Sequence, residues 1–451
     1  MNGFERNAIS QNSTLDAGMH REWSELTPSG YQNRVIDDRL GKLLRAFGAV
    51  EIVGPKWCGK TWTALRHARS ADRLDDAATF DAAMTDPSLV LTGAEPHLID
   101  EWQDVPSVWD AARRHVDENA NHKGQLILTG SSMPKDRTAI HHSGTGRMAR
   151  LRMWPMSLSE SGDSTGDVSL SSLFDGTFSP AERQTDIAEI ARWCCRGGWP
   201  ASLGVEDEFA MEAPGEYIAS VLDVSVPKLG KNPQTARALM KALSMNVSQA
   251  PTYSTLATDM SYGDDDRRPD EQTVKNYLDM LMDLYLLTDL SGWDPPLRSK
   301  RRVRTKPKRY FVDPSLPAAI LGASPRTMMR DTQTLGDLFE VLCLRDLNVY
   351  LSAMSGTGNR IAYYRDEKGL EVDVVIELAD GRWGAIEIKL SDLKVTDENA
   401  GKLLSFRDKI CGNPAAQVRE PEFMMFLVGR GKKAYRRRDG ILVVPVATLG
   451  A

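Results

Sequence analysis

The chain has 451 residues, of which 41% are hydrophobic and 26% charged, and its formal net charge at pH 7 is −6. This composition excludes a fibrous or low-complexity chain, and the length predicts about three domains. No apolar run is long enough for a membrane-spanning helix, and the five cysteines have no C-x-x-C spacing, which argues against a disulfide framework and a zinc site. Residues 1–30 are polar and lack the apolar core of a signal peptide, so we expect a loose tail on a cytoplasmic protein without a membrane partner.

A phosphate-binding loop is predicted between the first strand and the helix after it. The apolar residues 49–53 are typical of a buried strand, and the stretch from Gly54 to Thr61 fits G-x-x-x-x-G-K-[ST] in full. The loop predicts that Lys60 contacts the β- and γ-phosphates of ATP and that the Thr61 hydroxyl binds Mg²⁺. The residues expected to surround the nucleotide are Gly54, Pro55, Lys56, Trp57, Cys58, Gly59, Lys60, Thr61 and Trp62.

Two later strands are expected to bring polar groups to the same nucleotide. One ends in Asp100 and Glu101, and we expect Asp100 to hold the metal ion and Glu101 to activate the attacking water. The other, within residues 124–130, is followed by Ser131. Because ligand sites lie at the carboxyl ends of parallel strands, Ser131 or Thr129 is expected to sense the γ-phosphate, with an ordinary serine-rich turn as the alternative.

Arg147 lies in a glycine-bearing stretch that presents several arginines. An arginine donated to the nucleotide of a neighbouring subunit stabilises the charge that develops on the transferred phosphoryl group. We expect this role for Arg147, with a structural salt bridge as the alternative.

Together these motifs resemble a family of bacterial and archaeal AAA-type (AAA+) P-loop ATPases. The resemblance rests on Y-x-x-R-V-I-D-x-x-L from Tyr31, the phosphate-binding loop, L-I-D-E-W-Q, I-L-T-G-S-S, G-R-M-A-R-L-R-M-W-P-M-S-L-S-E and G-G-W-P. In that family the ATPase is fused to a C-terminal domain of unknown function that is similar to restriction endonucleases. The resemblance implies an α/β fold with an AAA+ core over residues 31–160, and hydrolysis at the subunit interfaces of a homo-oligomeric ring, expected to be a hexamer.

The middle of the chain is expected to form a helical lid over residues 161–240 and a winged-helix domain over residues 241–308. The second helix of the winged-helix domain carries several acids, which disfavours base reading, so we expect its basic wing to bind the DNA backbone. The cations expected to bind DNA are Arg298, Lys300, Arg301, Arg302 and Arg304, and a second basic cluster lies between Arg430 and Arg438. The alternatives are solvated loops and a purely structural winged helix.

Residues 309–451 are expected to form an α/β domain. Residues 370–376 and 385–390 alternate in polarity as strands do, and a three-residue loop ending in Gly381 would join them. With Gly381 in the left-handed region, this loop would place the acid of the first strand opposite the acid of the second.

The acids and a lysine on these strands have the spacing D-x₁₃-E-x-K. This spacing resembles that of PD-(D/E)xK nucleases, with Val372 in place of the proline, and implies a restriction-endonuclease-like fold. It implies a second Mg²⁺ site formed by Glu340, Asp373 and Glu387 with Lys389. Simple salt bridges and an inactive binding module are the alternatives.

The whole sequence predicts an ATP-hydrolysing, DNA-binding AAA+ motor that remodels or translocates DNA as a homo-oligomer, as helicases and branch-migration motors do. Three alternatives stay open: an ATP-gated, Mg²⁺-dependent DNA nuclease, a nucleotide-regulated defence or signalling switch, and a remodeller of protein clients. A nuclease would cleave DNA through Asp373, a switch would change its assembly state with ATP, and a protein remodeller would ignore DNA.

Overall fold

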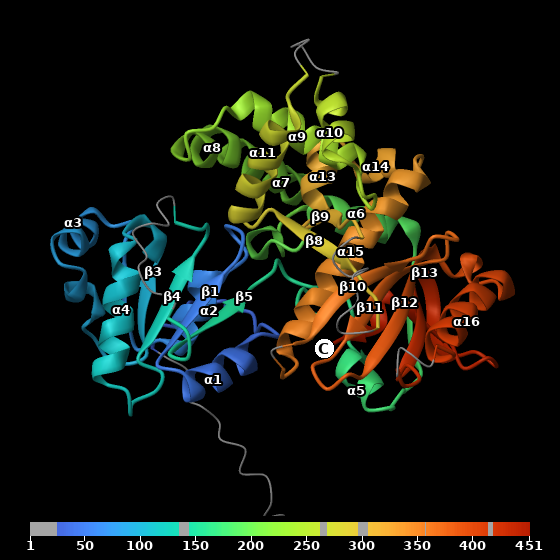
Figure 1. Ribbon diagram of the computed structural model, residues 1–451, viewed down its shortest axis with the longest axis horizontal. Helices are drawn as coiled ribbons and strands as arrows, with labels where there is room; N and C mark the ends of the chain where they lie inside the picture. Colours follow the sequence, from blue (N-terminus) through green and yellow to red (C-terminus); the bar gives the residue numbers. More distant parts are fainter. Residues whose placement is uncertain (1–24, 135–143, 262–267, 296–304, 357, 414–417) are drawn as a thin grey trace, which may run out of the picture.

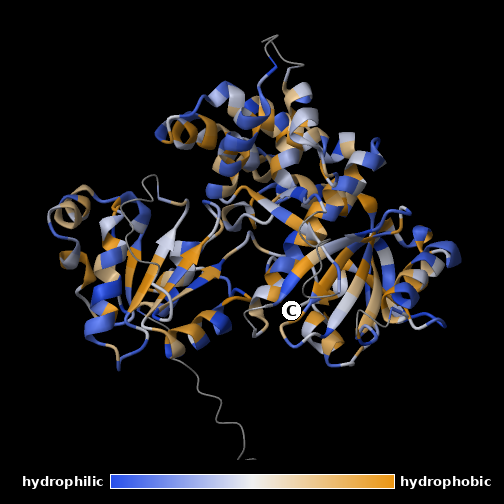
Figure 2. Ribbon diagram, viewed as in Figure 1, coloured by the Kyte–Doolittle hydropathy of each residue, from blue (hydrophilic) through white to orange (hydrophobic). Residues whose placement is uncertain are grey.

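The computed structural model describes residues 25–134, 144–261, 268–295, 305–356, 358–413 and 418–451. Figure 1 shows an α/β unit at the left, a helical unit at the top and a second α/β unit at the right. Hydrophobic residues are concentrated in the strands of both sheets (Figure 2). Within the described residues, no helix combines the length and the hydropathy needed to cross a bilayer.

The N-terminal sheet has five parallel strands in the order β2-β3-β4-β1-β5. Its elements are α1 (Asp37–Ala46), β1 (Ala49–Val53), α2 (Lys60–His67), β2 (Ser70–Arg73), α3 (Ala77–Thr85), η1 (Pro87–Leu91), β3 (His97–Asp100), η2 (Trp102–Asp104), α4 (Ser107–Glu118), β4 (Leu126–Gly130) and β5 (Met148–Arg152). The strands β1, β3 and β4 are buried along their whole length, as a parallel sheet covered on both faces requires. Because β1 pairs with β4 and β5, Val53 lies beside Gly130 and Arg152, and the carboxyl ends of these strands meet at one edge.

The helical unit follows this sheet in the chain. Its elements are β6 (Val168–Ser169), α5 (Leu170–Phe174), β7 (Ala181–Thr185), α6 (Ile187–Arg196), η4 (Pro200–Ser202), α7 (Asp207–Ser220), the π-helical turn η5 (Val221–Ser225), α8 (Val226–Lys228), α9 (Pro233–Met245), α10 (Tyr253–Met260) and α11 (Glu271–Asp283). Side chains fix the helix starts: Asp186 and Glu189 form a capping box on α6, and Asp270 caps α11. The segment 161–240 therefore contains helices, as expected, together with two short strands.

The C-terminal sheet has strands in the order β14-β13-β12-β11-β10-β8-β9, and β7 pairs with β13 outside this path. Its elements are β8 (Leu287–Gly292), β9 (Lys308–Phe311), α13 (Ser315–Ile320), α14 (Pro325–Met328), α15 (Thr332–Ala353), β10 (Arg360–Arg365), β11 (Glu371–Glu377), β12 (Trp383–Ser391), η6 (Asp392–Lys394), α16 (Asp397–Cys411), β13 (Phe423–Arg436), β14 (Leu442–Pro445), η7 (Val446–Thr448) and β15 (Leu449–Gly450). The helices α15 and α16 pack on this sheet in two separate hydrophobic clusters.

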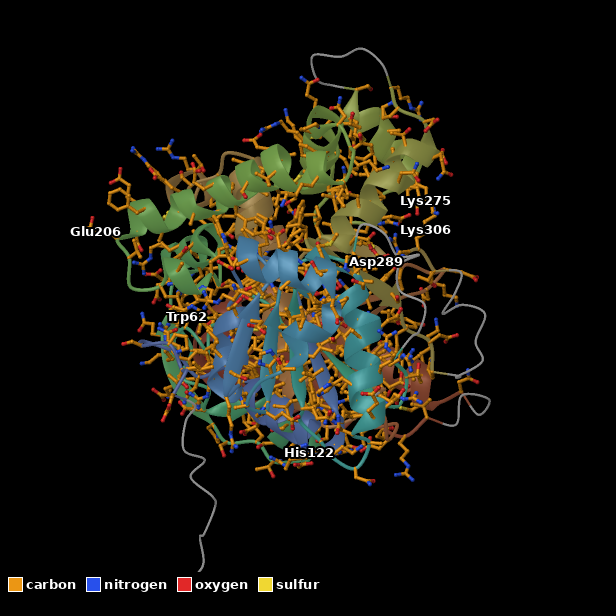
Figure 3. The ribbon with its side chains drawn as sticks, turned by 90° about the vertical axis from the view of Figure 1, so that its left-hand side faces the viewer. Trp62, His122, Glu206, Lys275, Asp289 and Lys306 are labelled. Carbon is orange, nitrogen blue, oxygen red and sulfur yellow. The ribbon has the colours of Figure 1, made fainter. Side chains whose placement is uncertain are left out.

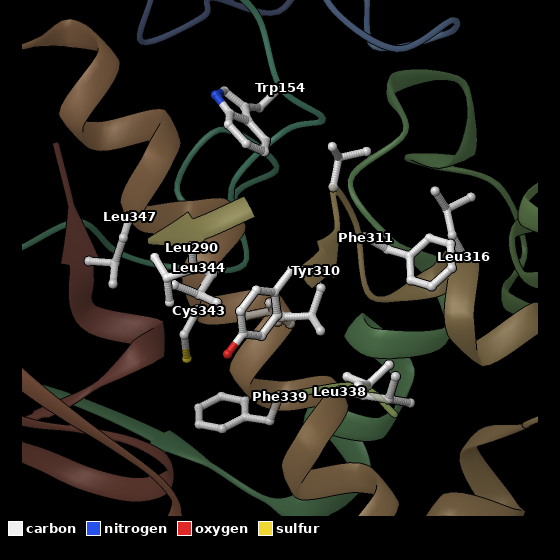
Figure 4. Packing of buried hydrophobic residues seen from close by; sticks show 14 of the residues in the cluster. Trp154, Leu290, Tyr310, Phe311, Leu316, Leu338, Phe339, Cys343, Leu344 and Leu347 are labelled. Carbon is white, nitrogen blue, oxygen red and sulfur yellow. The ribbon is translucent and has the colours of Figure 1, made fainter. Parts of the chain in front are cut away.

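The β8–β9 hairpin differs from the wing that the sequence predicts. β8 pairs antiparallel with β9 and also parallel with β10, so the hairpin forms one edge of the C-terminal sheet. Its apolar side chains are in the same cluster as α15, and Tyr310 lies beside Phe339 and Cys343 (Figure 4). The expected boundary between residues 308 and 309 falls inside β9, because strand periodicity does not reveal which strand is the partner.

Three charged side chains form a buried cluster where the units meet. Arg345 donates to Asp313 at 3.0 Å and pairs with Asp346 at 2.7 Å. Asp313 also accepts the backbone N–H of Gly198, and Asp346 accepts that of Leu158. Burial raises the pKa of Asp346 to about 6, although the Arg345 charge opposes this shift. The cluster therefore joins α15 to the helical unit and to the segment that leaves the N-terminal sheet.

Replacing Asp313 with alanine is expected to lower the free energy of unfolding by about 3–5 kcal/mol, because the buried charge of Arg345 loses a partner. Urea unfolding followed by circular dichroism measures the change. The control is Lys402→Ala, which removes an exposed ion pair with Glu398 on α16 and should leave the stability nearly unchanged. Equal losses in the two variants would contradict the role of the cluster.

Candidate active site

The loop from Gly54 to Thr61 joins β1 to α2 and has the turns that close phosphate contact requires. Gly59 precedes α2 with φ 98°, in the left-handed region that favours glycine. At Gly54 a Cβ atom would lie 2.2 Å from the backbone oxygen of Met153, so only glycine fits there. The loop N–H groups and the amino end of α2 can together bind phosphate oxygens.

Lys60, Thr61 and Asp100 lie together at the carboxyl edge of the sheet. The Lys60 ammonium donates to the Pro55 carbonyl at 2.8 Å, and the Thr61 hydroxyl donates to both Asp100 oxygens at 3.0 and 3.1 Å. Burial raises the pKa of Asp100, and the hydroxyl of Thr129, which also contacts it, opposes this shift. A hydroxyl and a carboxylate side by side are oxygen ligands that Mg²⁺ prefers, so these residues fit the ion.

Glu101 follows Asp100 in a left-handed conformation with φ 56°, which is strained for a residue with a side chain. Its N–H donates to the Thr129 hydroxyl at 3.2 Å, and its carboxylate accepts hydrogen bonds from Ser131 at 2.8 Å and from Gln103. The loop after β4 thus places Ser131 on the carboxylate expected to activate water.

The loop after Ser131 also contacts the end of α11 and the residues that follow it. The N–H of Met133 donates to the Asp283 carbonyl at 2.9 Å, and the Tyr285 hydroxyl lies 3.2 Å from the Met133 sulfur. Ser131 is therefore only two residues from a contact with the segment that leads into β8.

Arg147, which is predicted to act at an ATPase site, lies far from the phosphate-binding loop. Met148 pairs with Ala49 at the amino end of β1, so Arg147 lies at the opposite edge of the sheet. Its side chain is 48% exposed and forms an ion pair with Asp117 of α4. The salt bridge that the sequence leaves open as an alternative is therefore present.

A cavity of about 1500 Å³ lies between the phosphate-binding loop and the helical unit. Residues 29–32 and 199–203 line it together with Trp62. Figure 3 shows Glu206, the residue before α7, above Trp62. The cavity is large enough for a nucleoside triphosphate, because ligand sites of this kind measure about 300–1,000 Å³.

Aromatic contacts connect the phosphate-binding loop to the helical unit. Trp57 meets Tyr217 of α7 edge-on with ring centroids 5.4 Å apart, and Tyr217 stacks on Trp199 at 4.8 Å. Trp57 and Trp62 are 49% and 47% exposed, so both offer ring surface to a ligand in the cavity.

Sequence reasoning missed the roles of Arg34 and Lys228. The buried Arg34 donates to the Cys58 carbonyl at 2.7 Å and pairs with Glu160 at 3.0 Å, which fixes the phosphate-binding loop. The Y-x-x-R motif singles out Arg34 in the sequence, but no local pattern reveals the partners of its side chain. Lys228, at the end of α8, lines the same cavity from the helical unit, in addition to the cations Lys56, Lys60 and Arg73.

The strands β11 and β12 form the predicted hairpin. The acidic residues of the C-terminal domain, however, are not arranged as a metal site. Val374 pairs with Ile386 and Gly381 has φ 85°, so the predicted register and loop are confirmed. However, Asp373 accepts the Ile388 N–H at 2.8 Å.

The other carboxylates of this group contact a lysine ammonium and a tyrosine hydroxyl. Glu387 pairs with Lys389 at 2.7 Å, and Glu340 accepts the Tyr310 hydroxyl at 2.5 Å. Burial and the neighbouring Asp373 raise the pKa of Glu340 and of Glu387 to about 7. Across the described ranges, no three His, Cys, Asp or Glu side chains converge as a metal site, so the residues do not fit the second Mg²⁺.

The predicted DNA-binding cations are only partly described. Arg298, Lys300, Arg301, Arg302 and Arg304 lie outside the described residues. In the second basic cluster, Arg430, Lys432 and Arg438 are exposed on and after β13, whereas Lys433 pairs with Glu182 of β7.

Gly54→Ala is expected to lower kcat/KM for ATP hydrolysis by about 100-fold, because its Cβ would displace a loop that must be placed to within about 1 Å. Steady-state ATPase assays measure this change. Gly401→Ala on α16 is the control, since a Cβ there meets nothing within 4 Å, and it should leave the rate unchanged. Wild-type activity in Gly54→Ala would contradict the close approach of Met153.

Family models match three parts of the chain. Residues 47–162 match the model of an AAA domain, residues 187–327 match a domain of unknown function (DUF8612), and residues 335–449 match a second one (DUF4143). No curated protein matches the chain. A solved structure, the Walker-type ATPase PABY2304 of Pyrococcus abyssi, aligns over 66% of this chain and 98% of its own, with 10% identity and a TM-score of 0.40. The chain thus carries a P-loop ATPase domain of the AAA type, and neither of the other two domain matches assigns an activity.

Proposed function

We propose that this chain binds Mg²⁺ and ATP and hydrolyses ATP at the edge of its N-terminal sheet. The observation that carries the proposal is the arrangement of Lys60, Thr61, Asp100 and Glu101 at the carboxyl edge of the sheet, with Ser131 on Glu101. These side chains come from three segments of the sequence, and their positions match the needs of phosphoryl transfer.

Each residue has a distinct part in the proposed reaction. Lys60 and the loop N–H groups hold the phosphates, and Thr61 with Asp100 would hold Mg²⁺, which neutralises charge on the β- and γ-phosphates. Glu101 orients the attacking water and takes its proton. Ser131 and Gln103 both donate to Oε2 of Glu101, so the carboxylate can orient water through its other oxygen while these contacts hold it in place.

Glu101→Gln is expected to retain ATP binding and to lose hydrolysis by about 100-fold or more, because the amide cannot accept the proton of water. Binding is measured with a fluorescent ATP analogue, and hydrolysis by phosphate release. Gln103→Ala is the matched comparison, since it removes one contact of Glu101 and leaves the carboxylate in place. Full hydrolysis by Glu101→Gln would overturn the assignment of the base.

We further propose that the chain works as a homo-oligomer in which Arg147 completes the site of a neighbour. Its position at the far edge of the sheet and its partly exposed side chain support this role. In Arg147→Ala the phosphate-binding loop is intact, and in Lys60→Ala the arginine is intact. Each variant alone should be inactive, and their mixture should regain ATPase activity, because mixed interfaces combine both intact parts. Wild-type activity in Arg147→Ala alone, or a mixture that regains no activity, would contradict the role.

DNA is the proposed polyanion on which this motor acts, by translocation or remodelling. The exposed Arg430, Lys432 and Arg438 support it, since clustered cations bind the DNA backbone without reading sequence. The double variant Lys432→Glu/Arg438→Glu should lose salt-dependent DNA binding and DNA-stimulated ATPase activity, whereas Lys402→Glu on α16 should retain both. Failure of duplex, branched and single-stranded DNA to raise the ATPase rate, without salt-dependent binding, would contradict the motor.

A nucleotide-regulated switch is the second candidate function. Trp57 of the phosphate-binding loop contacts Tyr217 of the lid, and Arg34 connects the same loop to Glu160, so a change at the loop reaches both neighbouring units. A switch would turn ATP over slowly and change its assembly state between ATP and ADP, which light scattering after size-exclusion chromatography detects.

A further inference from the structure

Lys308 is a buried cation in the C-terminal acidic group, and the sequence gives no sign of this position. It begins β9 and is 5% exposed. Its ammonium lies 2.7 Å from Glu371 of β11 and 3.7 Å from Glu340 of α15. It also lies 5.2 Å from the ring centroid of Tyr363 on β10, a further favourable contact for a cation.

The ammonium lies among carboxylates from separate elements, which is the environment that a divalent cation occupies in a metal site. Glu340 and Glu371 approach it directly, and Asp373 lies near enough to stabilise its charge. A protonated amine has no lone pair to offer a metal, and its positive charge repels one. A divalent ion could use these oxygens only if the ammonium left.

The second lysine strengthens this arrangement. The Lys389 ammonium forms an ion pair with Glu387 at 2.7 Å, and the Ile388 N–H donates a hydrogen bond to Asp373. Two ammonium groups, a tyrosine hydroxyl and a backbone N–H thus contact the four acids of the group.

We propose that Lys308 is the internal cation of the C-terminal domain: its ammonium occupies the place of a divalent metal and fastens β9 to β11 and α15. The domain is therefore metal-independent and does not cleave DNA by metal-dependent hydrolysis. The inference is independent of the proposed ATPase reaction, which uses a different edge of a different sheet.

Manganese binding tests this inference in the full-length chain. The Asp100→Asn background removes the carboxylate expected to bind metal in the ATPase site, and electron paramagnetic resonance counts free Mn²⁺. We expect no Mn²⁺ binding that depends on Asp373 in this background. Adding Lys308→Met should create an Asp373-dependent Mn²⁺ site. We expect this variant to bind Mn²⁺ at least about tenfold more tightly than the Asp100→Asn parent does, because three nearby carboxylates lose their cation. Lys306→Met is the control, since this exposed neighbour contributes only its backbone carbonyl, to Tyr363.

Several outcomes would overturn the proposal. Mn²⁺ binding in the Asp100→Asn background that Asp373→Asn abolishes would show that the metal displaces Lys308. Mn²⁺-dependent DNA cleavage lost in Asp373→Asn would do the same. A folded Lys308→Met variant that gains no Mn²⁺ site would refute the claim that the ammonium holds the place of a metal. If that variant does not fold, the measurement on the Asp100→Asn parent decides.

Discussion

A buried arginine must be surrounded by acceptors, and Arg345 obtains them from segments that are far apart in the sequence. Asp313 and Asp346 pair with its guanidinium, and the same carboxylates also accept the N–H groups of Gly198 and Leu158. Because an unpaired charge in this position is costly, the cluster forms only when the helical unit, α15 and the segment after β5 are all in place. The relative arrangement of the units is thus specified by electrostatics as well as by apolar packing.

Arg34 likewise joins distant segments, beside the phosphate-binding loop. Its guanidinium binds the carbonyls of Cys58 and Trp154 and the carboxylate of Glu160. Glu160 in turn accepts the N–H of Ser157, next to the residue that contacts Asp346. Arg34 and Arg345 are therefore linked by hydrogen bonds through Glu160 and Asp346 and by the peptide bond between Ser157 and Leu158. This series connects the phosphate-binding loop to α15.

Local patterns predicted what depends on neighbours in sequence, and long-range contacts account for the rest. The loop after β1, the acids at the end of β3 and the hairpin loop at Gly381 follow from spacing, since each is decided within a few residues. The pairing of β8 with β10 and the position of Lys308 depend on residues more than thirty positions away, which periodicity cannot identify. A basic residue in a cation-rich stretch looks like part of a solvated surface until its partners are known.

The strand pairs β6–β15 and β7–β13 close the chain on itself, because residues 168–185 pair with residues 431–450. During synthesis residues 168–185 have no partner until residues 431–450 have emerged from the ribosome, whereas the five parallel strands can assemble much sooner. Maturation of this part of the fold thus waits for a segment about 250 positions further along the chain, and loss of that segment would leave unpaired strand edges at a distant point of the fold.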